Sequence, residues 1–210
     1  MSGSRAQILE AYRDLRDQAP VFAGLVAEFP FAVSIAARGE TERAAGEMVS
    51  GNYCDVLGVP PEVGRVLTPQ DDIAPGGHPV AVLSHGYWAR RFGGDRSVLD
   101  TTIVANGQAL TVVGVARKGF PGIQPGRQAD LFVPMMMKAQ MTPLWNALDD
   151  PKDRWVQIVG RLKPGLSRSA AETALVPVYR SLLRDLLPQM KGWDEKVQQR
   201  FLERRVLLLE

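Results

Sequence analysis

The centre of the chain reads TTIVANGQALTVVGVA over residues 101–116. Two extended apolar runs, 101–105 and 108–116, flank the dipeptide Asn106-Gly107. Both central residues of a type I′ turn need a positive φ, which asparagine and glycine tolerate best. The stretch therefore predicts a β-hairpin, and it is the most legible local signal in the 210 residues.

A buried strand and a helix are predicted just before this hairpin. The apolar run at 80–83 has the length and composition of a buried strand. Ser84 can cap a helix that continues through Phe92, because a serine hydroxyl can accept a hydrogen bond from the first helical turn. Gly93-Gly94 can end the helix, since glycine accepts the left-handed conformation usual after a last turn.

A second hairpin is predicted further upstream. Residues 31–36 read as a strand, a polar turn with Gly39 follows, and a second extended run continues to Ser50. A short helix comes next, with Asn52 as a suitable N-cap and Gly58 as its stop. Helix and strand signals thus alternate with hairpins, which is typical of an α+β domain.

The two ends of the chain predict a separate strand–helix unit. Apolar residues at helical spacing predict a helix over 6–18. Residues 155–162 alternate as a strand, and either Ser167, or Ser169 with Glu172 three residues on, can cap the helix that follows. A polar terminal helix around residue 200 precedes a predicted final strand over 205–209.

Composition narrows the function classes. Apolar residues make up 45% and charged residues 23%, with a net charge of +2, as in ordinary folded proteins. Acidic and basic residues are interspersed, so we expect no nucleic-acid partner, because phosphate binding needs a concentrated basic face. One cysteine, Cys54, excludes an internal disulfide, and only two histidines, His78 and His85, are available as metal ligands.

Ser84-His85 invites comparison with a hydrolase. Adjacent side chains diverge from a strand end or a helix start, so this pair is poorly placed to share a hydrogen bond. The Gly-x-Ser-x-Gly elbow of many hydrolases does not surround Ser84. Helix capping is the better interpretation. We therefore expect no catalytic residue and no enzymatic activity.

Other tempting sites are equally weak. His78 and His85 with Asp71 and Asp72 could be drawn as a metal site, but the carboxylates lie in a proline-rich loop without a helical frame, and a solvated acidic loop is the simpler interpretation. Glycines in the 118–126 segment lack the Gly-Lys-Ser/Thr of a phosphate loop. We expect neither a metal nor a cofactor. Cys54, at a helix start, is interpreted as a packing residue.

Two apolar features suit a contact surface instead. Phe120 and Ile123 lie on a glycine- and proline-rich loop, where burial is not guaranteed. Met135, Met136 and Met137 are adaptable side chains, common at surfaces that repack against partners. These five residues are the predicted partner-contact site, with packing against the local core as the alternative.

Several motifs share the order and spacing of one known family. They are SGNYCDVLGV (50–59), GR (64–65), VAVLS (80–84), WARRFGGD (88–95), IVANGQALTVVGVA (103–116), GF (119–120), DLFVP (130–134) and VGRLKPG (159–165). DLFVP is interpreted as a short edge strand, because Pro134 cannot donate to a ladder. The series resembles the periplasmic core domain of MacB-type ABC transporter permeases, including FtsX-like and acidobacterial duplicated orphan permeases.

The resemblance implies an α+β fold of two lobes. One, similar to the porter subdomains of efflux pumps, would comprise residues 1–49 and 136–210. The other, a mixed α/β, Sabre-like lobe, would be inserted as residues 50–135. Cys54 stands where the family usually has an aromatic residue, so looser packing is expected beneath the short helix. Asp100-Thr101 replaces a usual Gly-Arg before the hairpin.

The resemblance also implies a function. Such a domain lies in the periplasm as part of an inner-membrane permease and couples cytoplasmic ATP hydrolysis to periplasmic movement, for efflux or for extraction from the membrane. Its implied partners are an ABC ATPase subunit or domain, a second permease protomer and a periplasmic adaptor. The alternative is an extracytoplasmic sensor module that binds a ligand or protein without a role in transport.

Neither a membrane span nor a signal peptide can be read from the 210 residues. A span needs a run of roughly 20 apolar residues, and a signal peptide needs a basic segment followed by an apolar one. The opening Met-Ser-Gly-Ser and the abrupt ends predict a domain cut from a longer protein, with its targeting or membrane segments elsewhere.

Overall fold

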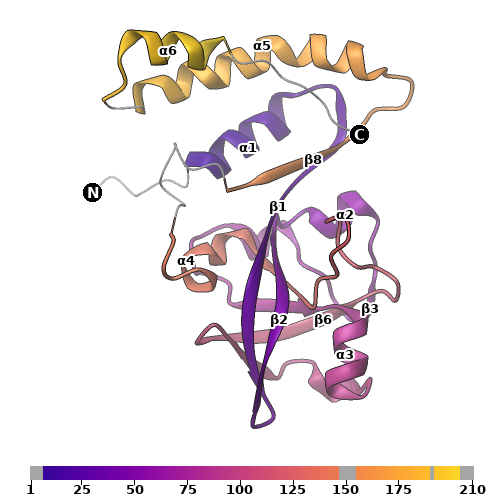
Figure 1. The fold of residues 1–210 in the computed structure, drawn as a ribbon. Coiled ribbons are helices and arrows are strands. Elements are labelled where there is room, and N and C mark those ends of the chain that lie inside the picture. Colours follow the sequence, from indigo (N-terminus) through magenta and orange to yellow (C-terminus); the bar gives the residue numbers. More distant parts are fainter. Residues whose placement is uncertain (1–6, 147–154, 190–191, 204–210) are drawn as a thin grey trace. The chain divides into compact units, whose positions relative to one another are not determined.

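The computed structural model describes residues 7–146, 155–189 and 192–203 (Figure 1). It divides into two compact units. Unit 1 combines the two chain ends, Met1–Leu25 and Leu148–Glu210, and unit 2 is the continuous segment Val26–Ala147. Helices and strands occur in both units, so the fold is mixed α/β.

Unit 2 is built on a sheet whose pairing closes on itself. Neighbouring strands follow the order β2-β7-β4-β6-β5-β1, and β1 also pairs with β2, while β3 extends from β6. The pairs β2–β7 and β4–β6 are parallel, and the others are antiparallel. The strands are β1 (Phe22–Ala37), β2 (Glu40–Val49), β3 (Pro61–Gly64), β4 (Val80–Leu83), β5 (Thr102–Ala105), β6 (Gln108–Ala116) and β7 (Leu131–Pro134).

Both predicted hairpins are confirmed. Asn106 and Gly107 join β5 to β6 with φ of 49° and 82°, as a type I′ turn requires. Arg38 and Gly39 join β1 to β2 with φ of 51° and 81°. The β1–β2 hairpin is longer than predicted, because β1 begins at Phe22 and continues through Pro30.

Asn106 also closes the sheet. Its backbone N–H donates to Ser34 O at 2.9 Å, and the Ser34 N–H donates to Asn106 Oδ1 at 2.8 Å. The regular register between β1 and β5 covers two residue pairs, Ile35 with Ala105 and Ala36 with Val104. The turn residue therefore extends a short pairing.

Short helices connect the strands of unit 2. Those described are α2 (Tyr53–Leu57), α3 (His85–Phe92), α4 (Lys138–Met141) and the 3₁₀ turns η1 (Pro69–Asp72), η2 (Arg96–Val98) and η3 (Met135–Met137). Ser84 caps α3 by accepting the Tyr87 N–H at 3.2 Å, and Gly93 ends it in the left-handed conformation, as predicted. Gly58 ends α2 likewise, whereas the Asn52 side chain makes no capping hydrogen bond.

The prediction of an edge strand at 130–134 is wrong. β7 lies between β2, to which it is parallel, and β4, to which it is antiparallel. All four of its residues are buried. Pro134 is tolerated because it is the last residue, where a missing N–H interrupts no continuing ladder.

Unit 1 packs helices against a strand. Its elements are α1 (Gln7–Gln18), β8 (Gln157–Leu162), α5 (Arg168–Leu186), η4 (Leu187–Gln189) and α6 (Glu195–Leu202). The first residues of β1, 22–25, belong to unit 1; β8 pairs with β1, and α1 lies beside α5 (Figure 1). Of the two caps predicted for α5, Ser167 is the one that accepts the Ala170 N–H. Ala19, Val21, Ala171 and Leu175 form the core between these elements. The predicted strand over 205–209 lies outside the described residues.

The unit boundaries differ from those placed on the sequence. The units divide after Leu25 and Ala147, whereas the lobe boundaries were expected after residues 49 and 135. The β1–β2 hairpin lies in unit 2 because its strands pair with β5 and β7. The porter-like and Sabre-like assignments of the lobes stay predictions. Within the described ranges, no helix combines the length and the apolar character needed to cross a bilayer.

Candidate functional site

Ser84 and His85 have structural roles. Ser84 is 5% exposed, and its hydroxyl oxygen accepts the N–H that caps α3. The His85 ring lies edge-to-face on Trp88, with 5.5 Å between ring centroids. The capping interpretation of Ser84 is therefore confirmed.

Asp71 and Asp72 hold loops together. Asp71 is 6% exposed and accepts two hydrogen bonds from Arg65, at 2.6 and 2.8 Å, so the expected solvated loop is wrong for this residue. Burial raises the pKa of Asp71, but hydrogen bonds from Arg65 and Thr68 outweigh it and hold the pKa below its usual value. Asp72 accepts the Gly51 and Met136 N–H groups at 3.2 and 2.8 Å. The described residues contain no group of three or more potential metal-ligating side chains.

The three methionines lie inside unit 2. Met135, Met136 and Met137 are 0%, 2% and 1% exposed. They form η3, directly after the buried strand β7. Their side chains therefore pack in the core instead of forming an exposed surface, which is the alternative that the sequence left open. A contribution of this segment to a partner contact stays a prediction.

Phe120 and Ile123 anchor the loop Lys118–Gly126, called here the 118–126 loop. Both are half-buried and pack against the core of unit 2. The Phe120 ring centroid lies 5.6 Å from that of Phe132 and 6.1 Å from that of Tyr53. The loop is thus fixed to the core by two apolar side chains, while Lys118 and Gly119 are exposed.

Two buried glutamates lie beneath this loop. Glu28 on β1 and Glu47 on β2 are 2% and 0% exposed. Glu28 pairs with Val49, and Pro30 pairs with Glu47, so the glutamates are diagonal neighbours on one face of the hairpin. A Cβ atom added at Gly122 would lie 2.4 Å from Glu47 Oε1, which shows how closely the loop backbone covers the carboxylate.

Each carboxylate is only half satisfied by the protein. Tyr53 donates its hydroxyl to Glu47 Oε2 at 3.1 Å, and the Gln124 amide donates to Glu28 Oε1. The second oxygens, Glu28 Oε2 and Glu47 Oε1, have no hydrogen-bond partner in the described protein. Burial raises the pKa of Glu47 to about 7, with a further increase from the charge of Glu28. The sequence signal for this pair is slight: Glu28 is the one glutamate of β1, and Glu47 is one of three in β2.

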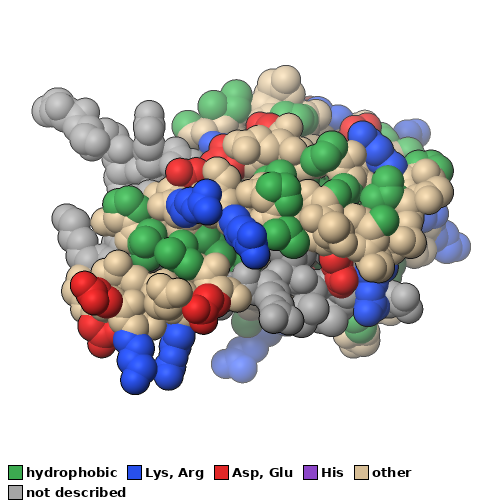
Figure 2. All heavy atoms as spheres, turned by 90° about the horizontal axis from the view of Figure 1, so that it is seen from above, with side chains coloured by type: hydrophobic (Ala, Val, Ile, Leu, Met, Phe, Trp, Pro, Cys, Tyr) green, Lys and Arg blue, Asp and Glu red, His purple; other side chains and the backbone are tan. Residues whose placement is uncertain are grey.

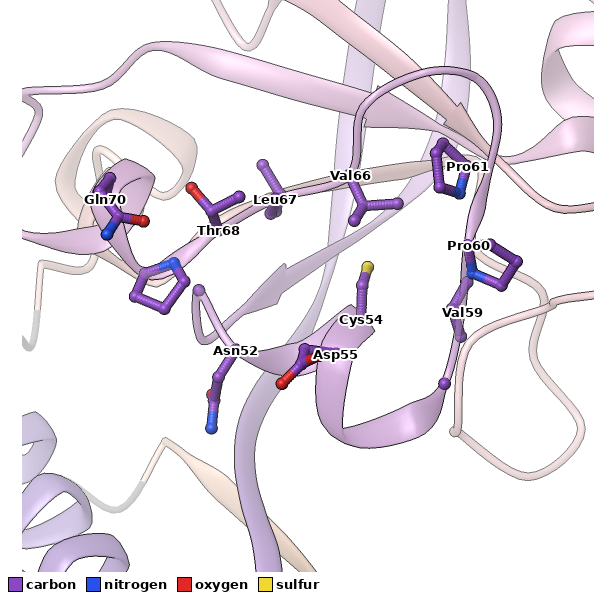
Figure 3. A pocket seen from close by; sticks show the side chains of 13 residues that line it. Asn52, Cys54, Asp55, Val59, Pro60, Pro61, Val66, Leu67, Thr68 and Gln70 are labelled. Atoms are coloured by element: carbon purple, nitrogen blue, oxygen red, sulfur yellow. The ribbon is translucent and has the colours of Figure 1, made fainter.

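A pocket of about 590 Å³ opens beside α2 (Figure 3). Its walls come from α2, β3 and the segment before η1. Val66 and Leu67 face Cys54, and the polar lining residues include Asp55 and Gln70. Looser packing was expected at this helix, where Cys54 replaces an aromatic residue. Cys54 is 1% exposed, and burial raises the pKa of its thiol to about 11, so it is a packing residue.

The surface carries mixed charge. On the face drawn in Figure 2, basic side chains are interspersed with acidic and hydrophobic ones. Several arginines of unit 2 are paired with carboxylates: Arg38 with Asp95, Arg90 with Asp130, and Arg91 with Glu40 and Glu42. This distribution differs from the continuous basic face on which nucleic-acid binding depends.

Solved structures share this fold at low sequence identity. The periplasmic region of MacB from Actinobacillus actinomycetemcomitans is 18% identical, with a TM-score of 0.61 over 83% of this chain and 73% of that one. The extracellular domain of the noncanonic ABC-type transporter YknZ from Gram-positive bacteria is 19% identical, with a TM-score of 0.62 over 84% and 82%. A domain of a putative permease protein from Porphyromonas gingivalis is 19% identical, with a TM-score of 0.59 over 81% and 75%.

Sequence comparison gives the family itself. No curated protein matches the chain. The profile of the MacB-like periplasmic core domain matches residues 2–178, which is most of the chain and includes unit 2, β8 and the first part of α5. The resemblance found in the motifs is thereby confirmed. The chain belongs to the family of MacB-like periplasmic core domains.

Proposed function

We propose that this chain is the extracytoplasmic domain of an ABC transporter permease and that it relays movements driven by cytoplasmic ATP hydrolysis, for efflux or for extraction of a substrate from the membrane. The observation that carries this proposal is the family match over residues 2–178. The shared fold with the periplasmic region of MacB and with the YknZ extracellular domain supports it. Two compact units connected by the chain suit a domain that changes shape.

The proposal includes partners and a location. The domain would face the periplasm as part of an inner-membrane permease. It would act with an ABC ATPase subunit or domain, with a second permease protomer and with a periplasmic adaptor. The 118–126 loop would supply part of a partner surface, because it exposes Lys118 and Gly119 on an anchored backbone.

A hydrogen-exchange comparison tests the loop. Amide exchange in residues 118–126 should slow when the adaptor or the second protomer is added, while exchange in the β1–β2 turn at Arg38-Gly39 serves as an internal control. Unchanged exchange in the loop with both partners would contradict this assignment.

We also propose that the domain carries out no chemistry of its own. Ser84 caps a helix, Asp71 and Asp72 hold loops, and Cys54 is buried with a raised pKa. The purified domain should neither turn over esters nor bind ATP. Specific ATP affinity in about the micromolar range would contradict this part of the proposal.

Distance measurements in the complete permease test the coupling. Spin labels at Thr41 on β2 and Lys196 on α6 would report on units 2 and 1, because both residues are exposed. Cys54, the one cysteine of the 210 residues, is buried and adds little background labelling from this domain. In lipid nanodiscs with the ATPase present, the label-to-label distance distribution should change between the nucleotide-free and ATP-bound states.

Two controls give this measurement its meaning. With an ATPase variant that binds but does not hydrolyse ATP, the label-to-label distances should stay in the ATP-bound distribution. Cycling between the two nucleotide states should then stop. Identical distributions in all nucleotide states would contradict coupling. A change produced by a ligand without ATP would favour the sensor alternative instead.

A further inference from the structure

The buried glutamates beneath the 118–126 loop form a defined cluster. Glu28 and Glu47 come from adjacent strands and share one face of the hairpin. The loop contacts both: Gln124 donates to Glu28, and the backbone at Gly122 lies directly over Glu47. The carboxylates and the loop that covers them are therefore one packed assembly.

Among the residues that the structure describes, few other charged or titratable groups face the pair. Tyr53 and Cys54 approach from α2, and the Tyr53 hydroxyl donates to Glu47. Arg127 follows the loop and attracts Glu47; its Nη2 donates to Phe31 O at 3.0 Å, while its buried Nε has no partner in the described protein. Strand β7, which pairs with β2 at Glu47, has no charged residue, and the loop from Gly119 to Gly126 has none either.

This count of charges favours one bound proton. Within the described ranges, two ionised carboxylates with two unpartnered oxygens would face a single guanidinium, and a buried unpaired charge costs several kcal/mol. One proton removes the excess negative charge and leaves one carboxylate facing Arg127. Neighbouring carboxylates usually bind one proton between them, because their like charges disfavour double ionisation, and they titrate as a pair.

We propose that Glu28 and Glu47 together bind one proton and that this proton stabilises the closed position of the 118–126 loop. Release breaks the carboxylic O–H bond and passes the proton to water. The second negative charge is then left beneath Gly122 without a donor, and opening of the loop admits water to solvate it. The inference concerns this cluster alone and is independent of transport.

The direction of the pH effect follows from the pKa of the buried group. Burial raises the pKa of Glu47 from 4.5 to about 7, and burial also raises that of Glu28. An open loop exposes the pair to water and returns these pKa values toward 4.5. Between pH 4.5 and about pH 7, each opening event releases a proton. The equilibrium constant for loop opening therefore increases about tenfold for each unit by which the pH rises.

Hydrogen exchange across pH tests the proposal on the 210-residue chain. After correction for the intrinsic pH dependence of exchange, protection of the loop amides should fall about tenfold per unit between roughly pH 5 and pH 7, then level off. Glu47→Gln keeps the shape of the side chain but cannot ionise, so its loop protection should vary with pH much less steeply than that of the wild type. Glu62→Gln removes an exposed carboxylate of β3 and should retain the wild-type profile.

Two results would overturn the proposal. One is loop protection in the wild type that does not change with pH over this range. The other is a Glu47→Gln variant with the wild-type slope. Should Glu47→Gln fail to fold, a ¹³C titration of the glutamate carboxyls in the wild type decides the matter: a carboxyl titrating near neutrality supports the shared proton, and full ionisation of every glutamate by about pH 5.5 excludes it.

Discussion

At the scale of single residues, Asp71 shows how an acidic side chain can be structural. Its two oxygens accept hydrogen bonds from the Arg65 guanidinium, and one also accepts the Thr68 N–H and hydroxyl, each at 2.9 Å. Planar, bidentate pairing of this kind is among the stronger ionic contacts. Arg65 is 46% exposed on its side-chain surface, so solvent screens part of the attraction.

Asp71→Asn should lower the free energy of unfolding by about 1–3 kcal/mol near neutral pH, because the amide cannot accept both arginine bonds. The pKa of Asp71 in the folded protein lies below its usual 3.8, so the carboxylate stabilises the fold above that value. The contribution is lost as the pH falls through the lowered pKa. Urea unfolding at about pH 6.5 and about pH 3 measures it.

The matched control is Asp100→Asn. Asp100 is exposed and has a φ of 59°, which asparagine tolerates equally well. This change should leave stability nearly unaltered at both pH values. A difference between wild type and Asp71→Asn that persists undiminished at the acidic pH would contradict the ionic explanation.

At Gly114, the lack of space for a side chain is what requires glycine. It lies on β6 opposite Gly64 of β3, and an added Cβ would be 1.9 Å from the Arg65 backbone oxygen. Backbone cannot move aside as a flexible side chain can, so Gly114→Ala should cost about 2–4 kcal/mol in urea unfolding. Gly86→Ala is the control: nothing lies within 4 Å of its added Cβ, and alanine favours helix α3. Equal stabilities for the two variants would refute the steric argument.

At the scale of elements, the β5–β6 hairpin depends on more than its turn. Besides its bonds to Ser34, Asn106 donates its side-chain amide to Met141 O at 2.7 Å, at the end of α4. One residue therefore joins the hairpin to β1 and to α4. The positive φ of Asn106 and its side-chain hydrogen bonds contribute separately to the stability of the fold.

Asn106→Gly separates them, because glycine keeps the turn conformation but removes the side chain. We expect a loss of about 1–3 kcal/mol, since the Ser34 N–H and Met141 carbonyl lose their partner. Asn106→Asp retains the acceptor for Ser34 and loses the donor to Met141, so it should lie in between. Urea unfolding of the three proteins measures the series. An Asn106→Gly variant as stable as the wild type would show that the turn conformation alone matters.

At the scale of the whole molecule, the chain has separate cores. Unit 2 has its core around Tyr53, Val82 and Phe132. Unit 1 has one core around Ala171 and Leu175 and another around Leu183 and Phe201. Separate cores allow each unit to retain its packing if the other loosens, which suits the relay of movement proposed above.

Leu175→Ala tests this independence. The side chain is 2% exposed in the core of unit 1, so its truncation should cost about 2–4 kcal/mol there. Native-state hydrogen exchange should accelerate in α5 and stay unchanged in β4 and β6. Leu110→Ala, at a fully buried position of β6, should give the reverse pattern. Equal loss of protection in both units would show that they unfold together.

Local signals in the sequence predicted many elements correctly. Asn106-Gly107 predicted its hairpin because a type I′ turn depends on the φ preferences of two adjacent residues. Ser84 and Gly93 predicted both ends of α3 because caps are also local. The ordered series of such signals was enough to predict the family.

Tertiary structure decided what depends on distant residues. Pro134 suggested an edge strand, but pairing with β2 and β4 placed β7 in the interior. The methionines suggested a surface, and the core enclosed them. Glu28 and Glu47 became a pair only through strand register and the loop above them. Turns and caps are set by neighbours in the chain, whereas burial and the pKa of a carboxylate are set by what folds over it, and the sequence does not state that directly.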